Sequence, residues 1–97
     1  MAKNPRIDSI KREIDTIKSH IEMRKKSIAS MTGDKAKIAD RYKAQIARAD
    51  KKDKEKLRDR KKSEIEHLAK QVLSHKRVID DYKKQILRKR EEIKKLK

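Results

Sequence analysis

The 97-residue sequence predicts an all-α fold, an antiparallel helical hairpin with a long second helix that assembles as a coiled-coil oligomer. Isoleucines recur at three- and four-residue intervals, which is the spacing of a helix that packs against another helix. Two tyrosines are the only aromatic residues, too few for the core of a globular domain. A single Gly and a single Pro leave little material for turns. High charge raises the alternative of disorder, but the regular isoleucine spacing opposes it.

The first helix is expected over residues 5–31. Asn4 can cap its N-terminus, and Pro5 suits the first helical position, where its missing N–H costs nothing. Arg24 is the only polar residue on the a and d positions of this segment, which are otherwise Ile7, Ile10, Ile14, Ile17, Ile21, Ile28 and Met31. Together with a turn, this helix forms the first unit of the chain, residues 1–33.

The turn of the hairpin is expected at Gly33, which can adopt the left-handed conformation that ends a helix. The second unit, residues 34–63, then returns antiparallel to the first. A turn at this place puts Arg24 near Tyr42, where its guanidinium either covers the ring or extends into solvent. It also leaves Ile7 and Ile14 facing charged residues, so we expect them to be either partly exposed or covered by another chain.

The second unit includes the most highly charged stretch of the chain, residues 50–62, in which Leu57 is the only apolar residue. Several of its acidic residues lie three or four positions from a cation, a spacing that can support a solvated helix. Two conformations are compatible with this composition. The stretch either continues as an exposed helix or bends to close a three-helix bundle. We favour the continuous helix, because Gly and Pro are absent after Asp34.

The third unit, residues 64–97, shows a second heptad repeat. β-Branched residues occupy the a positions and leucines occupy two of the d positions, a combination that favours a parallel two-stranded coiled coil and therefore a homodimer. His75 at a d position can fix the register, and a wider apolar stripe leaves room for a third helix. The residues predicted to form the oligomer interface are Ile65, Leu68, Val72, Ile79, Tyr82, Ile86, Ile93 and Leu96.

Nothing in the sequence indicates an enzyme, a cofactor or a metal site. The chain has no cysteine, which excludes thiolate ligands. His67 and His75 are eight residues apart, too far for the i,i+4 pairing typical of metal ligands on a helix. With one glycine, the chain cannot form a glycine-rich phosphate loop.

The net charge of +16 points to an anionic partner. Few aromatic, Asn and Gln residues are available for stacking on bases or reading them, so the sequence predicts non-specific contact with duplex nucleic acid in an architectural or packaging role. The cations predicted to bind it form three clusters: Lys51, Lys52, Lys54, Lys56, Arg58, Arg60, Lys61 and Lys62; Arg24, Lys25 and Lys26; and Arg88, Lys89 and Arg90.

Three alternatives remain open on the sequence. In the first, the chain is a protein–protein assembly factor (a scaffold, adaptor or stalk) that docks an acidic partner along the apolar stripe of its helices. In the second, the cations are a solvated surface without a binding role. Binding to an anionic membrane surface is disfavoured, because the apolar stripe is narrow and lacks Trp and Phe. The sequence shows neither a transmembrane segment nor a secretory signal peptide, so we expect the cytoplasm, a nucleoid or a virion interior.

Overall fold

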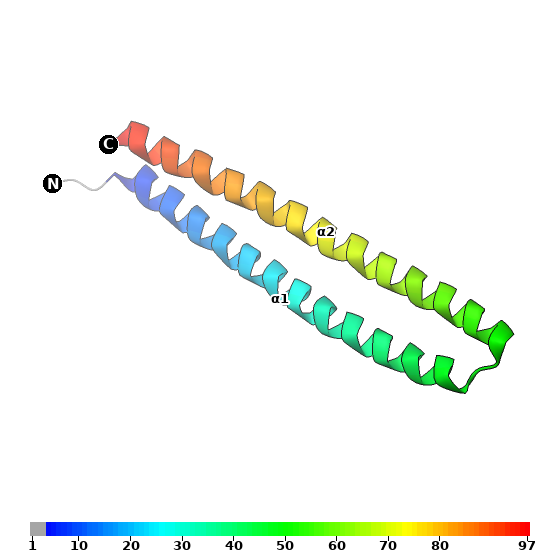
Figure 1. The fold of residues 1–97 in the computed structure, drawn as a ribbon. Coiled ribbons are helices and arrows are strands. Elements are labelled where there is room, and N and C mark those ends of the chain that lie inside the picture. Colours follow the sequence, from blue (N-terminus) through cyan, green and yellow to red (C-terminus); the bar gives the residue numbers. More distant parts are fainter. Residues whose placement is uncertain (1–3) are drawn as a thin grey trace.

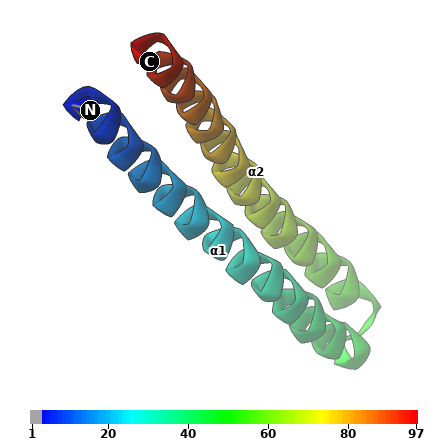
Figure 2. The ribbon, with the colours of Figure 1, turned by 90° about the vertical axis from the view of Figure 1, so that its left-hand side faces the viewer.

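The computed structural model describes residues 4–97, which form two long antiparallel helices. Helix α1 spans Pro5–Arg48 and helix α2 spans Lys51–Leu96. Their Cα atoms fill a rod 77 Å long and 15 Å wide (Figure 1). The two helices also remain side by side in the perpendicular view (Figure 2), with the start of α1 and the end of α2 at the same end of the rod. The prediction of an all-α helical hairpin is confirmed.

The N-terminus of α1 is built as its sequence predicts. The side-chain oxygen of Asn4 accepts a hydrogen bond from the backbone N–H of Arg6 at 3.0 Å. Pro5 occupies the first turn, and Asp8 places negative charge at the positive end of the helix dipole. These contacts fix the start of the isoleucine ladder.

The predicted turn at Gly33 is wrong, because Gly33 lies inside α1. No glycine among the described residues has a positive φ, so Gly33 does not adopt the left-handed conformation on which the prediction depended. A glycine inside a helix costs only about 1 kcal/mol relative to alanine. Packing of the long helix against α2 offsets a cost of that size, so the helix continues through Gly33 to Arg48.

The hairpin instead turns at Ala49 and Asp50, two residues with extended backbone conformations. Both have negative φ values, −84° and −77°, which any residue can adopt, so this turn needs no glycine. The Asp50 carboxylate accepts a hydrogen bond from the backbone N–H of Asp53 at 3.1 Å and so caps α2. The expectation of a helix running unbroken from Asp34 is therefore also wrong. The charged stretch after the turn is helical, and it does not bend into a third helix.

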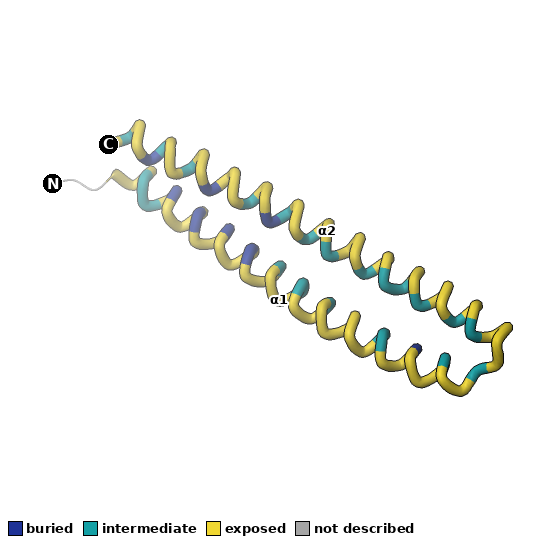
Figure 3. Tube along the Cα trace, in the orientation of Figure 1, coloured by how far each residue is buried: buried dark blue, intermediate teal, exposed yellow. Residues whose placement is uncertain are grey.

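Isoleucines from both helices form the core of the rod. Ile10, Ile14, Ile17 and Ile21 of α1 are buried against three isoleucines of α2, Ile79, Ile86 and Ile93. Figure 3 shows these buried positions on the facing sides of the helices, gathered toward the end where the chain termini lie. The expectation that Ile7 and Ile14 face charge is wrong: Ile14 is only 6% exposed, and Ile7 packs against the same cluster.

The C-terminal heptad repeat finds its partner within the same chain. The predicted oligomer interface includes Ile79, Ile86 and Ile93, which are buried against α1, and Tyr82 and Leu96, which pack against the same core. A turn at Gly33 left this repeat without an intramolecular partner, whereas the turn at Ala49 and Asp50 aligns it with the isoleucine ladder. The formation of a homodimer stays a prediction. The C-terminal heptad repeat does not require one, because it packs against α1 of the same chain.

Toward the turn, the core becomes thinner (Figure 3). Tyr42 is the one buried side chain of α1 in this half of the rod. Ile38, Ile46 and Leu57 are half-buried. The guanidinium of Arg41 lies 5.2 Å from the centre of the Tyr42 ring, so the cation over this ring is Arg41 and not Arg24.

Candidate functional site

Arg24 points between the helices and not toward a partner. Its Nη1 atom lies 3.0 Å from Nδ1 of His75, and both residues are half-buried. A guanidinium can only donate hydrogen bonds, so His75 accepts with an unprotonated Nδ1. Arg24 was one of the predicted nucleic-acid contacts. In the structure, Arg24 and His75 together form a polar layer in the contact between the two helices.

The end of the rod at the turn, residues 35–62, is its most basic part and is called the basic end below. It contains thirteen Lys and Arg residues against five Asp and Glu residues, so it carries half of the net charge of +16. Part of this charge lies at the a and d positions of the two heptad repeats, which here include Lys35, Lys54, Arg58 and Lys61. Lys54 and Lys61 are half-buried between the helices, and the other cations of the predicted 51–62 cluster are exposed.

The acidic residues of the basic end do not neutralise its cations by direct contact. Within residues 4–97, the one ion pair that includes a cation of the basic end joins Arg41 Nη2 to Glu64 Oε2 at 2.8 Å. The expected pairs inside the stretch 50–62, such as Asp50 with Lys54, are not formed within 4.0 Å. The exposed cations are therefore free to contact an external anion.

Both tyrosines are engaged in the hairpin itself. Tyr42 is 6% exposed beneath Arg41. Tyr82 stacks on His20, with ring centroids 5.7 Å apart and an interplanar angle of 17°. Phe and Trp are absent, so no Phe, Tyr or Trp ring is free for a nucleic-acid base to stack on.

One edge of the rod is closed by interactions between the helices and is called the paired edge. Arg6 Nη2 binds Glu92 Oε1 at 2.7 Å, and Lys89 Nζ binds Glu13 Oε2 at 2.7 Å. The pair of Arg41 and Glu64 continues the same edge toward the turn. These residues, with His20, come mainly from the g positions of the two heptad repeats, which lie beside each other in an antiparallel pair.

The opposite edge carries cations on both helices and is called the groove edge. The e positions of α1 and α2 here are Lys11, Lys18, Lys25, Lys76, Lys83 and Arg90. Like charges at flanking positions repel each other, so this edge weakens the hairpin that the paired edge stabilises. The hairpin is thus electrostatically asymmetric.

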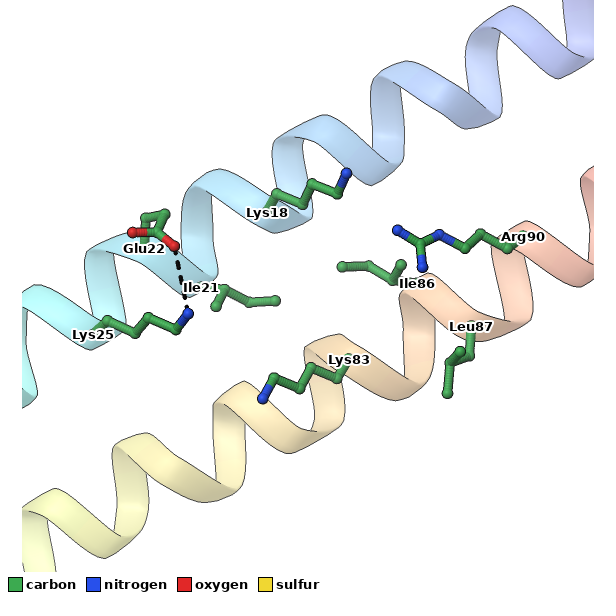
Figure 4. A pocket seen from close by; sticks show the side chains of 8 residues that line it. All are labelled: Lys18, Ile21, Glu22, Lys25, Lys83, Ile86, Leu87 and Arg90. Carbon is green, nitrogen blue, oxygen red and sulfur yellow. Dashed lines mark ion pairs between the residues drawn. The ribbon is translucent and has the colours of Figure 1, made fainter.

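A groove with an apolar floor runs along this edge (Figure 4). Its main section has a volume of about 630 Å³. Ile21 and Ile86 extend toward each other from the two helices and form the floor, beside Leu87 of α2. The cations Lys18, Lys25, Lys83 and Arg90 form the walls.

The groove continues toward the termini of the chain. A section of about 320 Å³ shares Lys18 and Arg90 with the main section and extends past Ile14 and Ile93. Toward the turn, a separate hollow of about 420 Å³ lies beside Val72, Leu73 and Lys76. Two acidic residues lie along the groove: Glu22 contacts Lys25 at 3.6 Å, and Asp15 lines the section beside Ile14. The cations outnumber them, so the charge of the groove stays positive.

The structure therefore separates the three predicted clusters. Residues 51–62 lie at the turn, residues 24–26 near the middle of the rod, and residues 88–90 near the termini. Lys89 is held by Glu13, whereas Lys25 and Arg90 both line the main section of the groove. Sequence reasoning missed Lys18 and Lys83, because they are not part of a cluster. Their shared e position in two heptad repeats is the signal that identifies them.

Two further features bear on the class of site: the arrangement of possible metal ligands and the hydropathy of the helices. Within residues 4–97, no three His, Asp or Glu side chains lie close enough together to hold a metal ion. Neither helix has a stretch that is long and apolar enough to cross a membrane, again within the described part of the chain.

Comparison of the chain with protein-family models, with curated proteins and with solved structures found no match.

Proposed function

We propose that the protein binds duplex nucleic acid without sequence specificity, as an architectural or packaging component and not as an enzyme. The observation that carries this proposal is the concentration of half of the net charge in the basic end, with its cations exposed and largely without ion pairs. Duplex DNA presents about one negative charge per 1.7 Å of helix axis, so a dense set of cations gains affinity by releasing condensed counterions.

The mode of binding follows from what the basic end lacks. Both tyrosines are engaged, which leaves cations as its means of contact. Lys and Arg contacts to phosphate position a protein on a duplex but do not read its sequence. Non-specific binding to the backbone, strongly weakened by salt, is the behaviour that this surface supports.

A salt series with full-length protein and a duplex of about 25 base pairs tests the proposal. The test variant changes only exposed cations and leaves the half-buried Lys54 and Lys61 intact. It carries six substitutions to Gln, at Lys51, Lys52, Lys56, Arg58, Arg60 and Lys62. The control variant removes the same amount of exposed charge elsewhere, with Gln at Arg12, Lys70, Arg77, Lys84, Lys94 and Lys95.

The wild-type affinity should fall steeply with salt, with a slope of log K against log salt of roughly −0.9 for each phosphate contact. The test variant should bind more weakly and show a flatter slope, while the control keeps most of the affinity. Circular dichroism should show equal helix content in all three proteins. Absence of duplex binding at low salt would overturn the proposal, and equal losses in both variants would refute its assignment to the basic end.

A second candidate function is assembly with an acidic protein partner. The observation that favours it is the exposure of large apolar side chains beside the cations of the groove edge. Leu87 is 60% exposed and Leu73 is 48% exposed. A phosphate backbone would not bury such side chains, whereas a protein partner would.

A further inference from the structure

We infer that the groove edge binds an acidic amphipathic helix of a partner protein, which completes a three-helix bundle with α1 and α2. This inference specifies the second candidate function and does not depend on nucleic-acid binding at the basic end. It is based on the shape of the groove, its apolar floor, the sign of its walls and the spacing of its cations.

The floor of the groove is the edge of the core between the two helices. Ile21 and Ile86 are buried, at 6% and 7% exposure, and line the groove. Leu87 beside them is 60% exposed. A third apolar surface laid on the groove would bury Leu87 and exclude water from the isoleucines below it, and this burial favours binding.

The positive charge of the groove walls favours an acidic partner. In the main section, Lys18, Lys25, Lys83 and Arg90 surround the floor, and Glu22 is the one acidic residue there. Figure 4 shows Lys18 and Arg90 extending from opposite helices toward the same part of the groove. An acidic partner would relieve the repulsion between these like charges in addition to making its own contacts, so charge complementarity favours it.

The spacing of the cations matches a helix. Lys11, Lys18 and Lys25 recur every seven residues on α1, and Lys76, Lys83 and Arg90 do the same on α2. Seven residues of helix span about 10 Å. A helix with apolar a and d residues flanked by Glu at e and g positions has the same repeat, so its acids can meet successive cations along both walls.

A second copy of this chain fits the groove less well. Two groove edges facing each other would bring the same cations together. Asp8, Asp15 and Glu22 recur along the flank of α1 that borders the groove, and Met23 is the only exposed large apolar residue of α1 within the described part of the chain. With one such side chain, α1 of a second copy cannot fill an apolar floor that runs along several helical turns.

Three synthetic 28-residue peptides test the inference, with binding to the full-length protein measured by fluorescence anisotropy. The first has Leu at a and d positions and Glu at e and g positions. The second keeps Leu and replaces the flanking Glu by Lys. The third keeps Glu and replaces Leu by Ser. The first peptide should bind, and the other two should bind at least about 10-fold more weakly, because each lacks one of the two required features.

Variants locate the binding site. Leu87→Gln should weaken the acidic peptide about 10-fold, as expected for loss of one buried leucine. The quadruple variant K18Q/K25Q/K83Q/R90Q should weaken it further and reduce its salt dependence. Met23→Gln is the matched control, because Met23 is 66% exposed but lies outside the groove, and it should leave affinity unchanged. The six-Gln variant of the basic end should lose duplex binding and keep peptide binding.

Several outcomes would overturn the inference. One is failure of the acidic peptide to bind, and another is equal binding by Leu87→Gln and wild type. Sedimentation that shows a wild-type oligomer dissociated by Leu87→Gln would assign the groove to a second copy of the chain. Duplex DNA that competes with the peptide in wild type and in the six-Gln variant alike would assign the groove to nucleic acid. Failure of the wild-type protein to bind duplex DNA at low salt would refute only the function proposed for the basic end.

Discussion

Arg24 and His75 show how a single layer of the seam can differ from its neighbours. They meet at 3.0 Å, whereas isoleucines supply all the buried side chains in the layers toward the termini. A polar pair in such a layer costs stability but disfavours registers in which either partner would face an apolar residue. The pairing also removes Arg24 from the cations that can reach a ligand.

A double-mutant cycle measures this contact. We expect Arg24→Leu and His75→Leu to show a coupling energy of about 0.5–1.5 kcal/mol in urea unfolding, because each single change leaves the other polar group without its partner. The double variant should therefore be more stable than the sum of the single effects indicates. Strictly additive effects would mean that the hydrogen bond does not contribute to the free energy of unfolding.

At the scale of the elements, a helical hairpin follows from the heptad repeats, whereas the position of the turn, and with it the pairing of the two repeats, does not. The capped start at Asn4 and the isoleucine ladder were correctly predicted, because they depend on local chemistry. Gly33 was misread since a glycine is equally compatible with a turn and with a tolerated position in a long helix. The actual turn has only the cap at Asp50 as its local signal.

The position of the turn also explains which of the candidate sites could be predicted from the sequence. The charged stretch 51–62 is conspicuous in the sequence, and the structure leaves most of it exposed. The groove edge is formed by residues of both helices, so it can be recognised only when the pairing of the two helices is known. A turn placed at Gly33 gives the wrong pairing and does not bring these residues together. Only with the turn at Ala49 and Asp50 do Lys18 and Arg90 come from opposite walls of one groove.

Gly33→Ala tests the continuity of α1. An added Cβ meets no atom within 4 Å, and the backbone at Gly33 is helical. We therefore expect the substitution to raise the free energy of unfolding by about 0.5–1 kcal/mol, because alanine has the higher helix propensity. Thermal or urea unfolding followed by circular dichroism measures it. If the variant is instead less stable, a left-handed Gly33 and the turn that it implies regain support.

For the whole molecule, electrostatic repulsion opposes folding. The chain carries +16, and the four ion pairs within residues 4–97 lie at largely exposed side chains, where each contributes at most about 1 kcal/mol. Screening should therefore weaken the repulsion more than the attractions.

We expect the melting temperature to rise by several degrees between 20 mM and 500 mM sodium chloride, since a gain of 1 kcal/mol corresponds to about 4–8 °C for a chain of this size. The six-Gln variant of the basic end should show a smaller rise. Scanning calorimetry across the salt series provides the measurement. A melting temperature that falls with salt would show that the ion pairs outweigh the repulsion.

The turn at Ala49 and Asp50 also determines how the molecule can change in length. Layers of the seam pair at equal distances from this turn, so one heptad can be added to or removed from both helices at the same height without disturbing the layers on either side. Each such step changes the separation between the basic end and the termini by about 10 Å. The rod is in this sense a modular spacer, whose span is encoded by the number of repeats and can vary independently of the chemistry at its two ends.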